Sequence, residues 1–313
     1  MHIHILGICG TFMGGIAAIA REAGYKVTGS DRQVYPPMSD QLRELGVEII
    51  EGFEPGQLEL EPDLFVIGNV MSRGMPIIEE ILDRKLPYCS GPEWLYEHVL
   101  KDRHVIAVSG THGKTTTTSI AAWVLEHAGF DPGYLIGGVP ANFEVSARLG
   151  SDPYFVIEAD EYDTAFFDKQ AKFLNYRPTT LVINNIEFDH ADIYPDIDAI
   201  LRQFHQLLRM LPGAGDLIVN AADKRIDELL EQGCWTPVTQ FTSGDAAPET
   251  VWSAQRGDDN ALQLWHDGAL QGECVWPQPG QHNLENAVAA ALACQAAGVD
   301  LQDCLAGLRH SAG

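Results

Sequence analysis

Short apolar runs alternate with longer segments whose apolar positions follow a helical period along the first part of the chain. The expected strands are His2 to Leu6, Tyr25 to Thr28, Val47 to Ile50, Asp63 to Ile67 and Tyr88 to Cys89. The expected helices are Gly14 to Glu22, Met38 to Leu45 and Ile77 to Arg84. Alternation of this kind predicts a parallel sheet that is covered by helices on both faces.

A second unit begins near His104 with the apolar run "HVIAVSG". Further buried strands are expected at Tyr154 to Ile157, Leu181 to Ile183 and Leu217 to Val219, with a long helix at Ile197 to Met210. Residues 241–277 are expected to form short strands in a meander, and "HNLENAVAAALACQAAG" is a strong helical pattern. The pattern therefore predicts an α/β protein with a Rossmann-like domain at 1–101 and a central P-loop-type ATPase domain at 102–313, which has a mostly parallel sheet and a small β meander.

Composition restricts the kind of ligand that the chain can bind. The 313 residues are enough for two domains, and 20 Lys and Arg against 44 Asp and Glu give a net charge of −24. A chain this acidic has no broad basic face that could bind nucleic acid. An anionic ligand must therefore be held by glycine loops, helix N-termini, single cations or a metal. The cysteines form no C-x-x-C pair, and neither a signal peptide nor an apolar run of membrane length is present. We expect a cytoplasmic protein that binds neither nucleic acid nor membrane.

The segment "SGTHGKTTTT" is the strongest local signal for nucleotide binding. Gly110 and Gly113 allow the backbone to approach phosphate oxygens, Lys114 supplies a cation, and Thr115 offers a hydroxyl to Mg²⁺. The full P-loop pattern requires a glycine where this chain has Val108, so the loop is a shortened variant. A preceding strand and a following helix give it the expected context.

Two further apolar runs end in polar residues. "YFVIEADEYD" places carboxylates just after a strand, and Glu158 is the expected Mg²⁺ ligand among them. "LVINNIEFDHAD" places His190 among carboxylates, where a histidine can ligate or orient a metal. Because both segments follow strands of the same predicted sheet, we expect them beside the phosphate loop.

The N-terminal stretch "HILGICGTFMGGIAAIA" has the strand, turn and helix of a dinucleotide site, but its spacing departs from G-x-G-x-x-G. Counted from Gly7, Cys9 and Phe12 occupy the places of the second and third glycines. The missing glycines argue against NAD. Backbone amides at Gly7, Gly10, Gly14 and Gly15 are instead expected to approach the diphosphate of a UDP-sugar, and a purely structural turn remains the alternative.

Together these segments resemble the Mur ligase family of ATP-dependent amide-forming enzymes. The shortened loop, the metal glutamate Glu158, the second-metal histidine His190 and an H-N-x-x-N segment occur here in the family's order. The resemblance implies ATP and Mg²⁺ as cofactors, with Lys114, Glu158 and His190 as catalytic residues and Thr115, Glu158 and His190 as metal ligands. It implies an ATP site formed by Gly110, Thr111, His112, Gly113, Lys114, Thr115, Thr116, His282, Asn283 and Asn286.

The resemblance also implies the reaction. We expect UDP-N-acetylmuramate to be joined to the tripeptide L-Ala-γ-D-Glu-meso-diaminopimelate through an acyl phosphate, in peptidoglycan recycling. The residues expected to bind the UDP-sugar are Gly7, Gly10, Thr11, Met13, Gly14, Ser30, Asp31, Ser72 and Arg73. Met75 departs from the family pattern "SRGNP" in this region. Family members usually continue into a C-terminal domain that binds the acceptor, and this chain is expected to end before it.

Three alternatives remain open at this point. The acceptor could be free L-alanine, as in de novo peptidoglycan synthesis. The chain could instead be a P-loop NTPase or kinase with an NAD-binding N-terminal domain. A chain without an acceptor domain could also bind its ligands and catalyse nothing.

Overall fold

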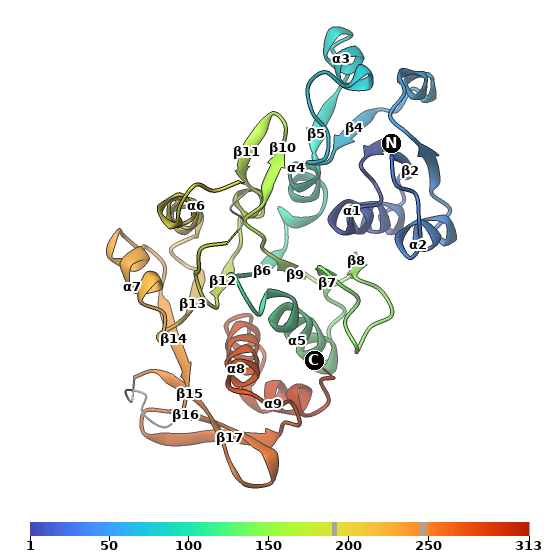
Figure 1. Ribbon diagram of the computed structural model, residues 1–313. Coiled ribbons are helices and arrows are strands. Elements are labelled where there is room, and N and C mark those ends of the chain that lie inside the picture. The colour runs from blue at the N-terminus through green and yellow to red at the C-terminus, as the bar shows by residue number, and fades with distance from the viewer. Residues whose placement is uncertain (190–192, 245–247, 249, 313) are drawn as a thin grey trace.

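The computed structural model describes residues 1–189, 193–244, 248 and 250–312. It confirms a mixed α/β fold with a parallel N-terminal sheet and a second, mostly parallel sheet (Figure 1). None of the helices in the described residues is both long and apolar enough to cross a lipid bilayer.

The N-terminal sheet has the strand order β3-β2-β1-β4-β5, and every neighbouring pair is parallel. Its strands are β1 (His2–Leu6), β2 (Lys26–Asp31), β3 (Glu48–Glu51), β4 (Leu64–Ile67) and β5 (Tyr88–Ser90). The segments between them form α1 (Thr11–Glu22), α2 (Met38–Glu44), the 3₁₀ turn η1 (Pro55–Leu60) and α3 (Pro76–Asp83). β1 is buried at every position because it lies at the centre of the sheet, with helices and neighbouring strands around it.

The central sheet has the strand order β17-β16-β15-β14-β13-β12-β6-β9-β7-β8. The strands are β6 (His104–Ser109), β7 (Gly133–Leu135), β8 (Ala147–Arg148), β9 (Tyr154–Glu158), β12 (Thr180–Ile183), β13 (Asp216–Asn220), β14 (Val238–Ser243), β15 (Trp252–Arg256), β16 (Ala261–His266) and β17 (Ala269–Val275). Pairing is parallel from β7 to β15 and antiparallel at both edges of the sheet. The predicted meander therefore corresponds to β15, β16 and β17, with the 3₁₀ turn η4 (Asp258–Asn260) between the first two.

Helices cover both faces of the central sheet (Figure 1). One face packs against α5 (Lys114–His127), α8 (Gln281–Ala296) and α9 (Leu301–Arg309), which share an apolar core with β6, β9 and β12. The opposite face packs against α6 (Ile197–Met210) and α7 (Lys224–Glu231). A small antiparallel hairpin, β10 (Asp163–Ala165) and β11 (Asp168–Ala171), leads into the 3₁₀ turn η3 (Lys172–Asn175).

One apolar core runs from the N-terminal sheet to the second face of the central sheet. It includes Ile5 and Ile16 from the N-terminal part, Leu135 and Ala147 from the edge strands β7 and β8, and Phe173. α4 (Gly91–Leu95) and the π-helical turn η2 (Tyr96–Leu100) connect the two parts of the chain. Because the core is shared, the sheets are held in a fixed relation. The division at residues 101 and 102 stays a prediction.

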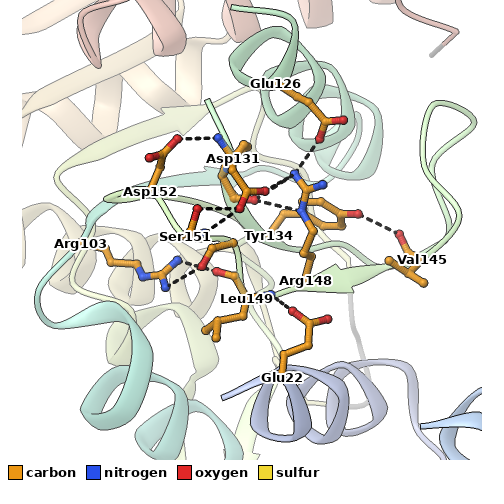
Figure 2. Close-up of polar contacts among 12 residues, drawn as sticks. Glu22, Arg103, Glu126, Asp131, Tyr134, Val145, Arg148, Leu149, Ser151 and Asp152 are labelled. Carbon is orange, nitrogen blue, oxygen red and sulfur yellow. Dashed lines mark hydrogen bonds and ion pairs between the residues drawn. The ribbon is translucent and has the colours of Figure 1, made fainter. Parts of the chain in front are cut away.

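Polar contacts also fix the edge of the central sheet near α1 (Figure 2). Arg148 on β8 contacts the Glu126 carboxylate at 2.6 Å and the Asp131 carboxylate at 3.5 Å, and its guanidinium lies 5.0 Å from the centre of the Tyr134 ring. The amide of the next residue, Leu149, donates to the Glu22 carboxylate at the end of α1 at 2.7 Å. The Arg148 contacts fix the β7–β8 hairpin within the central part, and the hydrogen bond from Leu149 to Glu22 joins it to α1.

Candidate active site

The phosphate loop, residues 109–116, connects the carboxyl end of β6 to the start of α5. The two flanking strands of β6 are β9 and β12, and all three run in parallel. The residues that follow these strands therefore meet at one edge of the sheet, which is where ligands bind in folds of this class. We expected from the sequence that the "EADEYD" and "INNIE" segments lie beside the phosphate loop, and this topology is consistent with that prediction.

The loop leaves the amides at the start of α5 available to a ligand. Gly113 has a φ of +81°, and the first i to i−4 bond into α5 runs from the Thr117 amide to the Gly113 carbonyl at 2.9 Å. The amides of Lys114, Thr115 and Thr116 are therefore outside the helical hydrogen-bond ladder. A helix N-terminus with free amides favours the binding of phosphate.

Lys114 is held among oxygen atoms behind the loop. Its Nζ donates to the Gly110 carbonyl at 2.7 Å and to the Glu161 carboxylate at 3.3 Å, and it lies 3.8 Å from the Asp160 carboxylate. The side chain is 11% exposed, so this ammonium group is almost entirely inside the protein. The two acidic side chains compensate its charge.

Thr115 and Glu158 form the closest polar pair between the loop and β9. The Thr115 Oγ1 donates to Glu158 Oε1 at 3.0 Å and lies 3.1 Å from Oε2, and Oε2 also accepts from the Gly137 amide at 2.8 Å. Hydroxyl and carboxylate oxygens are the ligands that Mg²⁺ prefers. Within the described residues, no group of three His, Cys, Asp or Glu side chains could hold a metal ion. A Mg²⁺ ion here would complete its shell with phosphate oxygens and water, as is usual for this ion.

Asparagine side chains brace the loop from two sides. Asn185 accepts from the His112 amide at 2.7 Å and donates to the His112 carbonyl at 3.2 Å. On α8, the buried Asn286 accepts from the Thr117 hydroxyl at 3.1 Å, and that hydroxyl accepts from Asn184 at 3.0 Å. A Cβ at Gly113 would lie only 2.4 Å from the Asn286 Oδ1. Asn286 therefore packs directly under the loop.

The remaining predicted nucleotide residues lie around this core. Thr111 exchanges hydrogen bonds with the backbone of Glu187, and Thr116 lies in the first turn of α5. His282 is exposed in the first turn of α8, and Asn283 donates to the Pro279 carbonyl at 2.7 Å. The predicted metal ligand His190 lies outside the described residues. These assignments stay predictions.

A cavity of about 340 Å³ lies between the two sheets. From the N-terminal part it is lined by Gly7, Gly10, Thr11, Phe12, Met13, Asn69, Val70 and Pro92. From the central part it is lined by Leu135, Ile136, Gly137, Glu158, Asp160, Tyr162, Thr164, Lys172 and Tyr176. Glu158 thus belongs both to the cavity and to the contact with Thr115. The cavity and the phosphate loop share this carboxylate.

Four of the residues predicted to bind a UDP-sugar line the cavity, namely Gly7, Gly10, Thr11 and Met13. The structure gives Gly14 and Gly15 a packing role. A Cβ at Gly14 would lie 2.3 Å from the sulfur of Met38, and one at Gly15 would lie 2.2 Å from Leu135 on β7. The small residues therefore let α1 approach its neighbours closely.

The other predicted UDP-sugar residues do not line the cavity. The Ser30 carbonyl accepts from the Gly7 amide at 2.8 Å, and the Asp31 carboxylate accepts from the Cys9 amide at 2.9 Å. Both residues therefore shape the glycine turn. Arg73 is exposed and pairs with Glu79 at 2.9 Å, and the Ser72 amide donates to the sulfur of Met75.

Several cavity residues were not predicted from the sequence. Tyr162 and Thr164 come from the start of the β10–β11 hairpin, and Lys172 and Tyr176 come from η3 and the residue after it, where no nucleotide-binding pattern exists. The hairpin was itself not predicted. The one signal in the sequence that points to this part of the cavity is a lysine, Lys172, in the segment after the acidic motif "EADEYD".

Comparisons with known proteins agree with this architecture. Residues 2–103 match the model described as Mur ligase family, catalytic domain, and residues 108–294 match the model of the Mur ligase middle domain. The chain is 52% identical over 304 residues to the UDP-N-acetylmuramate–L-alanyl-γ-D-glutamyl-meso-2,6-diaminoheptandioate ligase of Haemophilus influenzae, covering 96% of this chain and 66% of that protein. It is 51% identical to the Escherichia coli ligase of the same name, covering 96% of this chain and 65% of that protein.

The solved structures give the same result. A crystal structure of UDP-N-acetylmuramate:L-alanyl-γ-D-glutamyl-meso-diaminopimelate ligase from Neisseria meningitidis superposes with a TM-score of 0.95 at 50% identity, covering 100% of this chain and 98% of that one. This chain spans less than two thirds of the length of the two bacterial relatives named above. The matches decide against a kinase with an NAD-binding domain. The chain belongs to the Mur ligase family.

Proposed function

We propose that this chain binds ATP, Mg²⁺ and UDP-N-acetylmuramate for the ATP-dependent joining of that sugar nucleotide to L-Ala-γ-D-Glu-meso-diaminopimelate. The observation that carries the proposal is the shared position of Glu158. It faces the hydroxyl of Thr115 in the phosphate loop and also lines the cavity between the sheets. A nucleotide on the loop and an acid in the cavity would therefore meet at this carboxylate. The names of the relatives support the choice of donor and acceptor.

The loop residues have roles that follow from their positions. The free amides at the start of α5 would bind phosphate oxygens, and Lys114 would exchange its contact with Glu161 for the γ-phosphate. Thr115 and Glu158 would hold Mg²⁺, with His190 as the proposed ligand of a second ion. When bound, Mg²⁺ neutralises charge on the transferred phosphoryl group.

The proposed reaction has two steps. A lactyl carboxylate oxygen of the sugar nucleotide attacks the γ-phosphorus of ATP. The bond between that phosphorus and the β–γ bridging oxygen breaks, so ADP is released and an acyl phosphate is formed. The amine of the tripeptide then attacks the acyl carbon, releases inorganic phosphate and loses a proton. Two anions must come together in the first step, so the chain's contribution is to position them and to compensate their charge.

An assay with two acceptors and an isotope label tests the proposal. The protein is given ATP, Mg²⁺ and UDP-N-acetylmuramate labelled with ¹⁸O in the lactyl carboxylate, together with equal amounts of the tripeptide and L-alanine. The expected product carries the tripeptide, and the released phosphate contains one ¹⁸O atom. Lys114→Met is expected to abolish both signals, whereas Lys169→Met, which changes an exposed lysine, is expected to leave them unchanged.

Other results of this assay would contradict the proposal. A product that carries L-alanine in place of the tripeptide would show that the acceptor is the one used in de novo peptidoglycan synthesis, and would contradict the proposed acceptor. Phosphate without ¹⁸O beside a ligated product would exclude the acyl phosphate. Unchanged turnover in Lys114→Met would contradict the assignment of the phosphate loop.

A further inference from the structure

Lys172 is a buried cation whose ammonium group has no anionic partner among the residues that the structure describes. The residue begins η3, is only 9% exposed and lines the cavity between the two sheets. It makes neither a hydrogen bond nor an ion pair with any of the residues that the structure describes. A buried charge without a partner is unfavourable, so its presence in a cavity indicates a ligand that supplies one.

Two aromatic rings surround the ammonium group. Its Nζ lies 5.2 Å from the centre of the Phe12 ring and 5.6 Å from the centre of the Tyr162 ring. The electron-rich faces of these rings stabilise a cation in part, although they supply no negative charge. Phe12 comes from the N-terminal part and Tyr162 from the central part, so the ammonium group is contacted from both sides of the cavity.

The nearest acidic side chains do not neutralise Lys172 directly. Asp160 and Asp163 act on it electrostatically and favour its charged form, but burial has the larger effect and lowers the pKa of Lys172. Asp160 already lies 3.8 Å from Lys114, and Asp163 pairs with Lys169 at 2.6 Å. Asp160 and Asp163 are therefore shared with other lysines.

Tyr176 provides a second, independent sign of a missing polar partner. Its side chain is fully buried and lines the same cavity, and its hydroxyl has no hydrogen-bond partner among the described residues. Buried hydroxyl groups are nearly always satisfied, so this one also indicates a ligand or an ordered water in the cavity. An anion beside Lys172 could accept a hydrogen bond from the hydroxyl.

We propose that Lys172, held between Phe12 and Tyr162, binds a carboxylate or phosphate group of the sugar nucleotide in this cavity. The inference rests on the proposed function, because it assigns the ligand of this cavity. It adds a ligand-binding residue at the start of η3, outside the phosphate loop and the glycine turn.

Calorimetric titration of two sugar nucleotides tests the inference. UDP-N-acetylmuramate carries a lactyl carboxylate and a diphosphate, whereas UDP-N-acetylglucosamine carries only the diphosphate. Each is titrated into the unsubstituted protein, Lys172→Met, Lys172→Arg and the control Lys101→Met, whose lysine is exposed and pairs with Glu97 outside the cavity. Lys172→Met is expected to weaken binding of UDP-N-acetylmuramate roughly tenfold or more, because a charge-assisted hydrogen bond is lost. Lys172→Arg, which keeps the charge, is expected to retain more of the affinity, and the control to bind normally.

The melting temperature of the free protein separates ligand binding from a structural role. Removing an unpartnered buried charge is expected to leave the melting temperature of Lys172→Met unchanged or higher, while binding becomes weaker. A variant that binds poorly and also melts at a lower temperature would overturn the inference, because loss of folding would explain both changes. Should Lys172→Met fail to fold, Lys172→Gln provides the same comparison with a side chain that retains hydrogen bonding.

The two sugar nucleotides distinguish the source of the anion. Weaker binding of UDP-N-acetylmuramate alone supports a contact with the carboxylate, and weaker binding of both supports a contact with the diphosphate. Equal affinities in the unsubstituted protein and Lys172→Met overturn the inference and leave the proposed function intact. An unsubstituted protein that binds neither nucleotide overturns both.

Discussion

The Thr115 hydroxyl lies within hydrogen-bond distance of both oxygens of the Glu158 carboxylate, at 3.0 and 3.1 Å, although the two residues are 43 positions apart in the chain. This contact joins the first turn of α5 to the end of β9. It places a hydroxyl and a carboxylate where the phosphates of a nucleotide on the loop would end. These two oxygen-bearing groups suit the Mg²⁺ site proposed above, in which phosphate and water would supply the other ligands.

Replacing Glu158 with Gln is expected to weaken nucleotide binding only when Mg²⁺ is present. The amide retains the shape of the carboxylate and loses the charge that attracts the ion, so we expect at least a tenfold loss of affinity for Mg²⁺-ATP. Calorimetry with a non-hydrolysable ATP analogue, with and without Mg²⁺, measures the difference. Glu144→Gln, which changes an exposed carboxylate on the β7–β8 connection, is the control. The same Mg²⁺ dependence in Glu158→Gln and the unsubstituted protein would exclude the metal role.

Substituting Gly113 with Ala is expected to distort the phosphate loop. The glycine has a φ of +81°, and an added Cβ would lie 2.4 Å from Asn286 and 3.0 Å from Asn184. We expect a loss of about 1–3 kcal/mol in unfolding free energy and loss of nucleotide binding. Gly129→Ala is the matched control, because Gly129 has a φ of +91° and no atom within 4 Å of an added Cβ. Normal nucleotide binding by Gly113→Ala would show that the loop tolerates the contact with Asn286.

Arg148 is expected to stabilise the junction between α1 and the edge of the central sheet. Its guanidinium contacts Glu126, Asp131 and the Pro132 carbonyl, so Arg148→Met removes a donor from the Glu126 carboxylate and the Pro132 carbonyl and a positive charge from beside Asp131. We expect the unfolding free energy from urea titration to fall by about 1–3 kcal/mol. In contrast, Arg202→Met removes an exposed ion pair with Asp196 at 3.9 Å and is expected to change stability little. Equal effects of the two substitutions would mean that the network in Figure 2 adds nothing beyond surface charge.

The buried His4 is expected to make stability depend on pH. Burial lowers the pKa of His4 from 6.5 to about 4, while its ring contacts Thr28 and Gln57. The folded state thus resists protonation of His4. The contribution of this residue to the free energy of unfolding is fully present above pH 6.5 and is lost as the pH falls towards about 4. Between pH 7 and 4.5 this residue contributes a loss of about 2 kcal/mol.

Urea titrations at several pH values measure this contribution. His4→Gln is expected to show a shallower decline in unfolding free energy with falling pH, even where its absolute stability is lower. His282→Gln, which changes an exposed histidine, is expected to keep the slope of the unsubstituted protein. Identical slopes in all three proteins would show that His4 is not responsible.

Much of the fold could be predicted because its strands are short, apolar and buried. The segments at β1, β6, β9 and β12 and the helix Ile197–Met210 were placed within a residue or two of their observed bounds. The helix α1 begins three residues earlier than predicted, because Gly10 serves as its N-cap and Thr11 starts the first turn. The hairpins β7–β8 and β10–β11 were missed because their strands have two to four residues and no clear alternation.

The candidate site was predictable only where a motif marks it. The loop from Gly110 to Thr115 and the carboxylate Glu158 come together as the parallel order of β6 and β9 requires. The bracing role of Asn185 depends on tertiary contacts that no spacing in the sequence reveals. Lys172 was also missed, since a lysine in a polar segment is usually exposed. Gly14 and Gly15 were expected to approach a ligand, and the structure shows their close packing against Met38 and Leu135.

Titration of UDP-N-acetylmuramate into the chain saturated with Mg²⁺ and a non-hydrolysable ATP analogue tests the central claim most directly. Glu158 lines the cavity between the sheets and contacts Thr115 in the phosphate loop, so the proposed function requires both ligands to occupy one molecule at once. The predicted result is saturable binding with one UDP-N-acetylmuramate per chain. Failure to bind at millimolar concentration, or displacement of the ATP analogue by the sugar nucleotide, would contradict the account.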